Sequence, residues 1–327
     1  MKALVTGGGG FLGQYIVEQL LNRGDEVRSL SRRSYPALNS LGVEQIEGDI
    51  QDREKTDLAC QGVDTVFHVA AIAGIWGPWK KFYGINTLGT LNVIESCRRQ
   101  AVGKLVYCSS PSVAFDGLDQ LGVDESVPYP SRWLCYYPQT KAYAEQAVLE
   151  SNSDSLMTCA LRPHLIWGPR DQHLIPRLIE RARSGKLRLV GEGSNLVDNV
   201  YVENAAAAHL QAADAMKPGA AVCGEAYFIS QGSPVNCWDW INEILEQTGQ
   251  SRVKRRISYR LAWNAGLLLE GLYKVLGWQS EPRMTRFLAA QLATSHYYDI
   301  GKAARDFGYS PEVSHEEGMK RLAESLK

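Results

Sequence analysis

The chain has 327 residues, of which 35 are Lys or Arg and 36 are Asp or Glu, so its net charge is -1 at pH 7. This balance argues against a nucleic-acid partner and against attraction of the whole chain to an anionic membrane, while the length allows one large core with an appended lobe. The seven cysteines contain no C-x-x-C pair, so we expect neither a disulfide framework nor a bound metal, and we expect a reducing, cytoplasmic location.

Six short apolar segments alternate with longer helical patterns through the first half of the chain. The first begins near residue 3, which leaves no room for a signal peptide, and no apolar run approaches the roughly 18 residues of a membrane span. Strands separated by helix-length segments need crossover connections, which predicts a parallel sheet covered on both faces. We therefore predict an α/β fold with a doubly wound parallel sheet of the Rossmann type. The expected strands are 2–7, 26–31, 43–48, 64–71, 104–110 and 157–163.

The pattern loosens after residue 167. A helix is expected at 173–185, a strand at 224–230, and two further helices at 236–249 and 258–278. The sequence thus predicts a smaller, interleaved C-terminal substrate-binding lobe beside the dinucleotide-binding domain. The predicted division assigns 1–166 and about 200–230 to the dinucleotide-binding domain, and about 167–199 and 231–327 to the lobe.

The helix expected at 259–278 carries an apolar stripe and follows the basic segment "RVKRR". Three interpretations remain open: a lid over a fatty chain, a contact with a membrane surface, or a core helix with a solvated basic flank. We favour the core helix. The stripe consists of Leu261, Ala265, Leu268, Leu272 and Val275.

The segment "TGGGGFLG" joins the first strand to the first helix. Glycines at 7, 10 and 13 permit a tight turn, a close approach of the backbone to a pyrophosphate and close packing of helix on strand. The helix N-terminus adds free N–H groups. We expect a dinucleotide here, bound by Gly7, Gly10, Phe11, Leu12 and Gly13.

The end of the second strand, "SLSRRS", indicates which dinucleotide is bound. An NAD site usually has an Asp or Glu about 20 residues beyond the last glycine, whereas this chain has Ser31, Arg32 and Arg33. Guanidinium groups suit a 2'-phosphate, so we predict NADP(H), with Arg32 as the main phosphate ligand; solvated surface charge is the alternative. Asp49, beside Ile50, is expected to receive the adenine amino group, unless it caps the following helix.

Three tyrosines and one lysine lie in "CYYPQTKAYAEQ", residues 135–146. Residues four apart share a helix face, and Tyr137 alone is paired in this way with a cation, Lys141. An ammonium stabilises a phenolate and would lower the phenol pKa toward neutrality, as a proton donor to a carbonyl requires. Ser109 and Ser110, at the carboxyl end of the strand 104–110, are placed to hold a substrate carbonyl oxygen.

These motifs occur in the order and spacing of an extended short-chain dehydrogenase/reductase, which the chain resembles over nearly its whole length. By that resemblance Ser110, Tyr137 and Lys141 form the catalytic triad, with Tyr137 the proton donor and Lys141 also binding the nicotinamide ribose. Ser112 is a weaker rival for Ser110. The resemblance further implies that Ala70, Ala71, Asn86, Ser109 and Pro163 line the dinucleotide.

Within this class the chain resembles the 3β-hydroxysteroid dehydrogenase subgroup. Sugar-nucleotide dehydratases carry Thr-Asp-Glu where this chain has Ser110-Pro111-Ser112, so the acids that eliminate water are absent. The segments "YYPQTKAYAEQAVL" and "LRPHLIWGPRDQHLIPRL" are similar to bacterial 2-alkyl-3-oxoalkanoate reductases of olefin biosynthesis. That resemblance implies reduction of a hydrophobic 3-keto acid, a homodimer through 80–100 and 136–152, and possible docking to neighbouring biosynthetic enzymes.

Two other functions remain as alternatives. One is a 3β-hydroxysteroid dehydrogenase or a related sterol or sugar-nucleotide oxidoreductase, and the other is an NADP-sensing regulatory protein, against which the intact triad argues. For the substrate we single out Trp76, Trp79, His164 and Trp167, although ordinary packing explains the tryptophans equally well. Arg162 and Arg170 could meet a substrate carboxylate, and Arg162 could instead pair with a buried acid.

Overall fold

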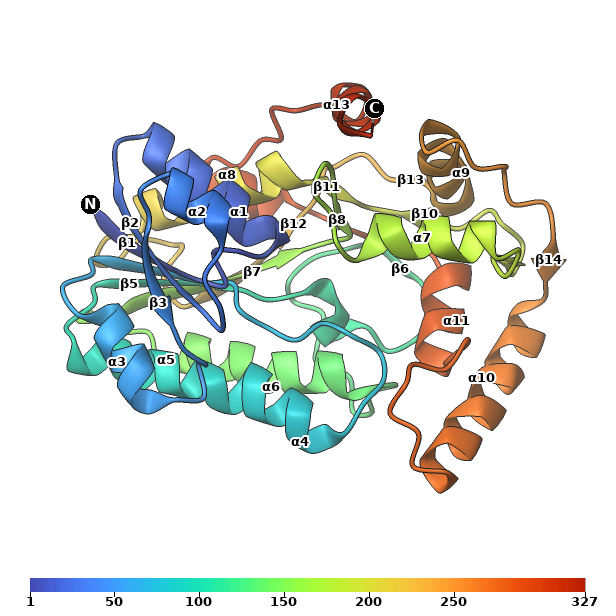
Figure 1. Cartoon of the computed structure of the whole chain (residues 1–327), viewed down its shortest axis with the longest axis horizontal. Helices are drawn as coiled ribbons and strands as arrows, with labels where there is room; N and C mark the ends of the chain where they lie inside the picture. Colours follow the sequence, from blue (N-terminus) through green and yellow to red (C-terminus); the bar gives the residue numbers. More distant parts are fainter. Residues whose placement is uncertain (327) are drawn as a thin grey trace.

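A seven-stranded parallel sheet forms the centre of the molecule in the computed structural model, which describes residues 1–326 (Figure 1). The strand order is β12-β7-β5-β4-β1-β2-β3, and every neighbouring pair is parallel. The predicted doubly wound fold is confirmed, including all six expected strands. The seven are β1 Lys2–Thr6, β2 Glu26–Ser31, β3 Glu44–Glu47, β4 Thr65–His68, β5 Lys104–Cys108, β7 Met157–Pro163 and β12 Glu225–Ile229.

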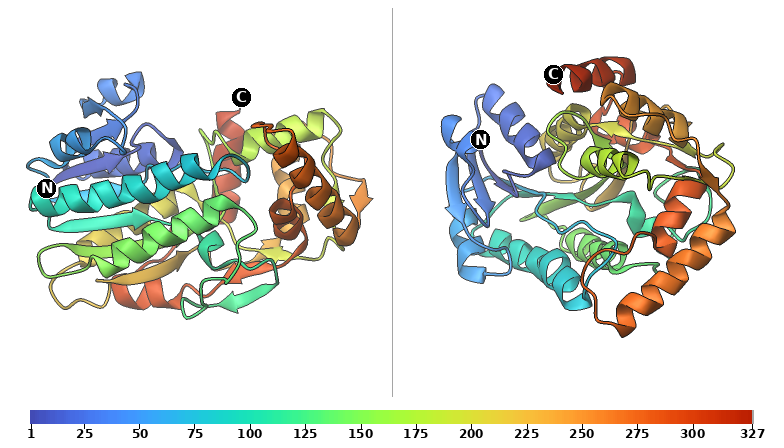
Figure 2. Two further views of the ribbon diagram at one scale, coloured as in Figure 1. Left: turned by 90° about the horizontal axis from the view of Figure 1, so that it is seen from below. Right: turned by 45° about the vertical axis from the view of Figure 1, so that its right-hand side comes forward.

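Helices cover both faces of this sheet because its strands are apolar on both sides. One face packs against α1 (Phe11–Asn22) and α8 (Val202–Ala215) around a core that includes Ile16 and Leu161. The opposite face is covered by α3 (Arg53–Cys60), α5 (Gly89–Arg99) and α6 (Tyr136–Glu150), as Figure 2 shows. Short elements complete this part: α2 Pro36–Ser40, α4 Trp79–Phe82, a π-helix Tyr83–Leu88 and a 3-10 helix Pro111–Ala114.

The order of strands reverses direction beside β1, with β2 on one side and β4 on the other. The chain leaves the carboxyl ends of β1 and β4 in opposite directions at this point, which opens a crevice at that edge of the sheet. Ligands of open α/β sheets bind in such crevices. The glycine loop follows the carboxyl end of β1, and Ser110 follows that of β5. Tyr137 and Lys141 lie on α6.

The second lobe is built on a four-stranded sheet of order β13-β10-β15-β6. Its strands and helices surround a separate core that contains Trp167, Trp238 and Trp240. Two small parallel pairs of strands accompany this sheet: β8 with β11, and β9 with β14. The elements are β6 Gln120–Val123, β8 Ile166–Trp167, α7 Leu174–Arg183, β9 Leu189–Val190, β10 Leu196–Val197, β11 Val200–Tyr201, β13 Val235–Asn236, α9 Cys237–Gln247, β14 Arg256–Ile257, α10 Tyr259–Val275, α11 Arg286–Ala293, β15 His296–Tyr298, α12 Gly301–Phe307 and α13 His315–Ser325.

The two lobes are interleaved more deeply than the sequence division implied. β6 lies within the expected dinucleotide domain, 1–166, yet pairs with β15 in the sheet of the second lobe. In the other direction, Ala303 of α12 and Tyr309 pack into the core beside the large sheet. Strand pairing between distant segments decides such boundaries, and local composition does not reveal it.

Helix α10 differs most from our expectation. We favoured a core helix with a buried apolar stripe, but only Ala262, Gly266 and Glu270 of α10 are buried. The predicted stripe faces solvent instead. Gly266 explains the close packing of the opposite side, because a side chain there would collide with the backbone at Thr285, where α11 begins. No helix in residues 1–326 is both long and apolar enough to cross a membrane.

Candidate active site

The glycine loop forms a tight cradle between β1 and α1. Gly7 has φ +73, a conformation that L side chains rarely adopt, and its N–H donates to the Leu30 carbonyl at 2.8 Å. A Cβ on Gly13 would collide with the Gly7 carbonyl. Helix α1 begins at Phe11 without a side-chain cap, which leaves the first N–H groups, including that of the buried Leu12, available to a phosphate.

Across the crevice, the chain that follows β4 passes close to the glycine loop. A Cβ on Gly7 would lie 3.0 Å from the Ala70 Cα, and the next residue, Ala71, is exposed. Asn86 is buried in the π-helix, where its amide accepts from the Ile72 N–H at 2.8 Å and donates to the Thr140 hydroxyl at 3.1 Å. Asn86 therefore holds this loop against α6, and its amide oxygen and nitrogen are both used within the protein.

The end of β2 presents two exposed arginines beside the cradle. Arg33 stacks on Tyr35, with 5.0 Å between its guanidinium carbon and the ring centroid, and Tyr35 packs against the loop at Gly9. Ser31 is half-buried, whereas Arg32 is exposed and so accessible to a phosphate.

Asp49 does not cap α3, so that alternative is excluded. The cap is Asp52, whose carboxylate accepts from the Glu54 and Lys55 N–H groups. The Asp49 carboxylate accepts from the Gln51 N–H at 2.9 Å and is partly exposed, beside the buried Ile50. Its second oxygen remains suited to an amino group.

Three candidate catalytic side chains meet where β5 ends and α6 begins. Ser110 caps the 3-10 helix, and its Oγ lies 2.8 Å from the Oγ of Ser112. The Ser110 hydroxyl also forms a hydrogen bond with Tyr137 that lowers the phenol pKa, which favours Ser110 over Ser112 as the partner of the phenol. Lys141 lies one turn along α6 from Tyr137, as the helical period predicted.

Burial opposes the pKa shift that we expected for the phenol. Removal from water raises the pKa of Tyr137 to about 12, and the hydrogen bond from Ser110 offsets only part of this rise. Lys141 is 2% exposed, and burial lowers its pKa to about 8. Our expectation of a phenol brought toward neutrality by lysine is therefore not met in this structure. The phenol is a neutral acid at physiological pH.

The ammonium of Lys141 is held from two sides. Its Nζ donates to the Cys108 carbonyl at 2.6 Å and lies 4.1 Å from the centroid of the Tyr107 ring. Both contacts come from β5, so strand and helix together determine where the charge sits. A cation–π contact and a charged hydrogen bond partly compensate for its burial.

Ser109 and Pro163 lie at the carboxyl ends of the neighbouring strands β5 and β7. Both are buried, and the Ser109 N–H donates to the Leu161 carbonyl at 2.6 Å. Arg162, the residue before Pro163 on β7, is buried as well. Its guanidinium forms a buried pair with Glu145 of α6, with 2.6 Å between NH2 and Oε1, so the alternative that it pairs with a buried acid is confirmed.

A groove of about 410 Å³ opens next to the start of α6. It lies between α10, the loop that follows β4, and the chain segment before α6. Cys135, Tyr136 and Gln139, which flank Tyr137 in sequence, form its inner wall. Seven aromatic side chains line it: Trp76, Trp79, Phe82, Trp133, Tyr136, Tyr273 and Trp278.

Of the four predicted substrate residues, Trp76 and Trp79 lie at the groove, and His164 and Trp167 do not. Trp76 and Trp79 line the groove, and the Trp76 indole N–H donates to the Trp278 carbonyl at 3.1 Å. Trp167 is fully buried, donates to Asn199 Oδ1 at 2.8 Å and belongs to the core of the second lobe. Trp167 is therefore a core residue and does not line the groove, contrary to its predicted role at the substrate.

His164 and Arg170 also differ from our expectation. His164 is 6% exposed, and its Nε2 lies 3.2 Å from Nδ1 of His296 on β15. Arg170 pairs with Glu18, at 2.6 Å and 2.9 Å, and stacks on the Tyr15 ring. Both side chains therefore make their contacts within the protein. After β7 the chain brings His164 to the second lobe and Arg170 to α1.

Two basic residues at the groove were missed in the sequence. Lys274 of α10 and Arg286 of α11 both line it, and Arg286 also donates to the buried Glu270 at 2.9 Å. Both are more than 130 positions from Tyr137, and no local pattern links them to it. Only the packing of α10 against α11 brings them there.

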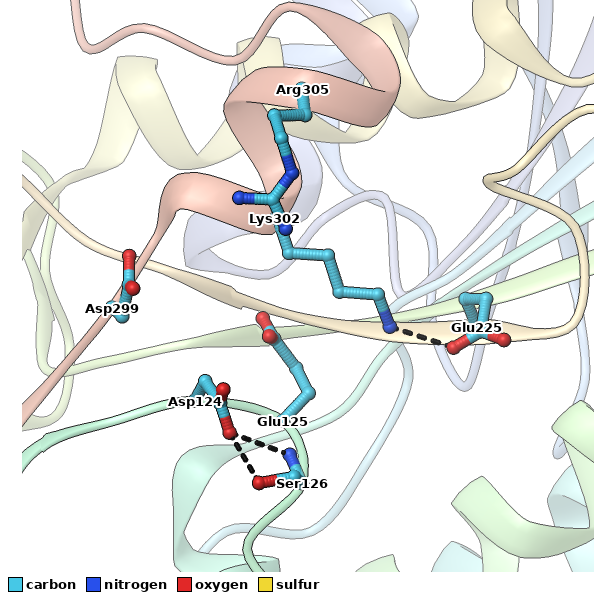
Figure 3. Close-up of a pocket in the computed structure, with 7 residues that line it drawn as sticks. All are labelled: Asp124, Glu125, Ser126, Glu225, Asp299, Lys302 and Arg305. Atoms are coloured by element: carbon cyan, nitrogen blue, oxygen red, sulfur yellow. Dashed lines mark hydrogen bonds and ion pairs between the residues drawn. The ribbon is translucent and has the colours of Figure 1, made fainter.

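A second depression, on the outer edge of the sheet, is lined by charged side chains (Figure 3). Lys302 of α12 pairs with Glu225 at 2.6 Å, and Glu125 accepts from the Phe228 N–H of the edge strand β12 at 2.7 Å. These contacts satisfy the edge of the sheet and its charges. No predicted site residue lies there, and residues 1–326 contain no group of three His, Cys, Asp or Glu that could hold a metal.

A Rossmann sheet with a glycine cradle, and with Ser110, Tyr137 and Lys141 at its carboxyl edge, defines an NAD(P)-dependent oxidoreductase of the extended short-chain dehydrogenase/reductase class. The chain belongs to the 3-beta hydroxysteroid dehydrogenase/isomerase family, whose model matches residues 4–261.

Individual relatives narrow the comparison. The chain is 51% identical to a 2-alkyl-3-oxoalkanoate reductase of Stenotrophomonas maltophilia, over 99% of both chains. It is 48% identical to a protein of the same name from Shewanella oneidensis, over 99% of this chain and 86% of the relative. A sterol-4-alpha-carboxylate 3-dehydrogenase (decarboxylating) of Mus musculus is 38% identical, over 99% and 91%. These names support a reductase or dehydrogenase role.

Solved structures agree on the fold. MoeE5 in complex with UDP-glucose and NAD superposes with a TM-score of 0.76 at 25% identity, over 99% of this chain and 98% of the other. The UDP-glucose 4-epimerase of Thermus thermophilus in complex with NAD gives 0.75 at 24%, over 100% and 99%. Both titles describe complexes with NAD, and the second likeness, at 24% identity, shows the fold alone.

Proposed function

We propose that this protein reduces the ketone of a hydrophobic 2-alkyl-3-oxoalkanoate to the 3-hydroxy acid, with NADPH as the hydride donor and Tyr137 as the proton donor. The observation that carries the proposal is the position of a half-buried, protonated Tyr137 beside Ser110, next to an aromatic groove. The names of two relatives, at 51% and 48% identity, supply the substrate class.

The residues present fit an NADP(H) molecule. A Cβ on Gly7, Gly10 or Gly13 would press against neighbouring backbone, so these positions carry no side chain and leave the cradle open to a pyrophosphate. The N-terminus of α1 points there as well. Arg32 would hold the 2'-phosphate and Asp49 the adenine amino group. When bound, the reduced nicotinamide supplies the hydride that adds to the carbonyl carbon.

The protein's own groups supply the rest of the reaction. Ser110 donates a hydrogen bond to the ketone oxygen and holds it beside the phenol. Tyr137, with a pKa near 12, is protonated at neutral pH and gives its proton to that oxygen as the C=O bond becomes a C–OH group. The nearby positive charge of Lys141 stabilises the phenolate that remains. Water then reprotonates the phenol.

The groove suits a substrate with an apolar chain. An alkyl chain that is buried against its aromatic walls gains about 25 cal/mol of binding free energy per Å² of apolar surface removed from water. The groove begins at the residues that flank Tyr137. Lys274 in the same groove adds positive charge that a carboxylate would meet, while the charge of Arg286 is balanced by Glu270, which also lines the groove. We therefore assign one alkyl chain of the substrate to this groove.

Oxidation of NADPH with a substrate panel tests the proposal. The panel comprises 2-alkyl-3-oxoalkanoates of increasing chain length, 3-ketosteroids and sugar nucleotides, each also measured with NADH. We expect turnover with the keto acids alone and a rise of kcat/KM with chain length, because each buried CH₂ contributes about 0.8 kcal/mol. Turnover only with steroids would establish the 3β-hydroxysteroid dehydrogenase alternative, and dinucleotide binding without any turnover would favour the regulatory one.

The homodimer remains a proposal of its own. α5 and α6 lie side by side, and their outer surfaces carry the exposed apolar or aromatic residues Leu91 and Tyr143. A second copy would cover this surface, which lies along the lower side of the molecule in Figure 1. Docking to a neighbouring biosynthetic enzyme stays a prediction of the resemblance.

A further inference from the structure

Helix α10 exposes the side of its surface that is apolar. Leu261, Leu268 and Val275 are 59%, 73% and 84% exposed, and Leu272 and Leu276 are also exposed. These five residues share one face at the helical period. A helix on the surface of a globular protein normally turns such a face to the core, so this orientation indicates that something else covers it.

The opposite face of α10 already has its partner. Ala262, Gly266 and Glu270 are buried against the start of α11, where Glu270 accepts from the Arg286 N–H at 2.7 Å. Rotation of the helix to bury its leucines would remove Glu270 from Arg286 and leave both charges without their partner. The orientation is therefore determined by polar contacts, and the exposed leucines are not the result of an alternative packing.

Positive charge is concentrated around this face. The segment from 251 to 286 contains eight basic and two acidic residues, in a chain whose net charge is -1. Both acids face inward or are paired, Glu270 with Arg286 and Glu281 with Arg177 at 3.3 Å. Seven exposed basic residues precede or flank the apolar face in the sequence, and two of them, Arg252 and Arg256, pair with Glu246 and Glu192 outside the segment. The seven are Arg252, Lys254, Arg255, Arg256, Arg260, Lys274 and Arg283.

We propose that α10 and the basic segment 252–256 form a lipid-docking surface that binds anionic bilayers, with the leucine face entering the boundary between headgroups and acyl chains. Apolar residues on one face and lysine or arginine beside them are what an interfacial helix requires. A second copy of the chain is a poorer occupant, because face-to-face contact would bring two strongly positive segments together. An anionic lipid surface satisfies both the apolar face and the charge.

The position of the aromatic groove gives this surface a consequence for catalysis. Tyr273, in the last turn of α10, and Trp278, just beyond its end, line the groove, and the Trp278 carbonyl also accepts from the Trp76 indole N–H. Docking through α10 would therefore place the groove entrance at the lipid surface. In combination with the proposed function, on which this step alone depends, a two-chain keto acid would enter from the bilayer without crossing water.

Flotation with vesicles tests the docking surface on the full chain. The probes are phosphatidylcholine vesicles with and without about 30% phosphatidylglycerol. We expect about tenfold more protein on the anionic vesicles, and a loss of most of this binding in about 0.5 M salt, where charges are strongly screened. Equal recovery with both vesicle types, or no binding to either, would overturn the proposal.

Paired variants assign the effect to α10. Leu268→Ser with Val275→Ser should reduce anionic-vesicle binding about tenfold, because each exposed apolar side chain contributes to insertion. Leu118→Ser with Leu121→Ser is the matched control, since those leucines are 67% and 59% exposed on another surface. Both variants should keep wild-type NADPH binding and wild-type turnover of a short keto acid in solution, which separates this test from that of the reaction.

Sedimentation equilibrium distinguishes a protein partner from a lipid surface. If Leu268→Ser with Val275→Ser converts an oligomer into a monomer and leaves vesicle binding unchanged, α10 is an interface between copies and the proposal is wrong. An unchanged oligomeric state together with lost vesicle binding supports it.

Discussion

Tyr137 differs from its two neighbouring tyrosines in its surroundings. Tyr136 and Tyr143 are 39% and 36% exposed, and both contact the edge of Trp79. Tyr137 is half-buried beside Ser110, with Lys141 one turn away. A raised phenol pKa favours the neutral acid, which is the form that a ketone reduction consumes.

Replacing Tyr137 by Phe removes the proton donor and leaves the ring in place. We expect kcat to fall by about 10² to 10⁴-fold, the range that a positioned general acid contributes, with NADPH affinity within about twofold of wild type. Stopped-flow turnover and fluorescence titration measure the two quantities. Tyr143→Phe, on the same helix but at the surface, is the control. Near-normal turnover of Tyr137→Phe would remove this residue from the mechanism.

Arg32 tests the choice between the two dinucleotides. Its guanidinium is exposed at the end of β2, and Arg32→Ala should weaken NADPH binding by about 10 to 100-fold, as expected for loss of a charged hydrogen bond. NADH affinity should change less than about twofold, because NADH lacks the 2'-phosphate. Calorimetric titrations of Arg32→Ala and of Arg98→Ala, a control on α5, give the comparison. An equal loss for both dinucleotides would contradict the role of Arg32.

At the scale of elements, α6 connects the chemistry to the fold. Tyr137, Lys141 and Glu145 follow one another at intervals of four and so share one face of the helix. Glu145 is fully buried, pairs with Arg162 of β7, and accepts from the Tyr129 hydroxyl at 2.7 Å. The same row of side chains that holds the proposed catalytic residues thus anchors the helix to the sheet.

Removal of one partner of that buried pair should be costly. Glu145→Ala leaves the Arg162 guanidinium buried without its carboxylate, and we expect the free energy of unfolding to fall by about 3 to 5 kcal/mol. Urea denaturation followed by circular dichroism measures this. Glu95→Ala, which breaks an exposed pair with Arg98, should change stability by less than about 1 kcal/mol. Similar losses in both variants would mean that the buried pair has no special structural role.

At the scale of the whole molecule, folding buries four histidines without charge. Burial lowers the pKa of His68 to about 3 and that of His209 to about 4, and also lowers the pKa of His164 and His296. His68 and His209 lie on either side of the large sheet, and the other two join the lobes at β7 and β15. Each histidine is neutral while the protein is folded.

These histidines predict that the protein is sensitive to acid. Their folded pKa values lie below the unfolded value of about 6.5, so the unfolded chain binds more protons below that pH and stability is lost as the pH falls. Each buried histidine contributes a slope of up to about 1.4 kcal/mol per pH unit. Urea midpoints measured between about pH 7.5 and 5 should decline, with proton uptake on unfolding. A constant midpoint over this interval would contradict the prediction.

The sequence by itself determined the parallel sheet, the glycine cradle and the choice of Tyr137 and Lys141, because each depends on residues close together in the chain and on a helical or strand period. The tertiary structure alone decided the rest. Trp167 became a core residue, α10 turned its leucines to solvent, and Lys274 and Arg286 joined Trp76 at one groove. The direction of the Tyr137 pKa shift belongs here as well, since it is set by burial, which the helical spacing from Lys141 did not reveal. Burial and charge depend on which segments pack together, and no local pattern encodes that.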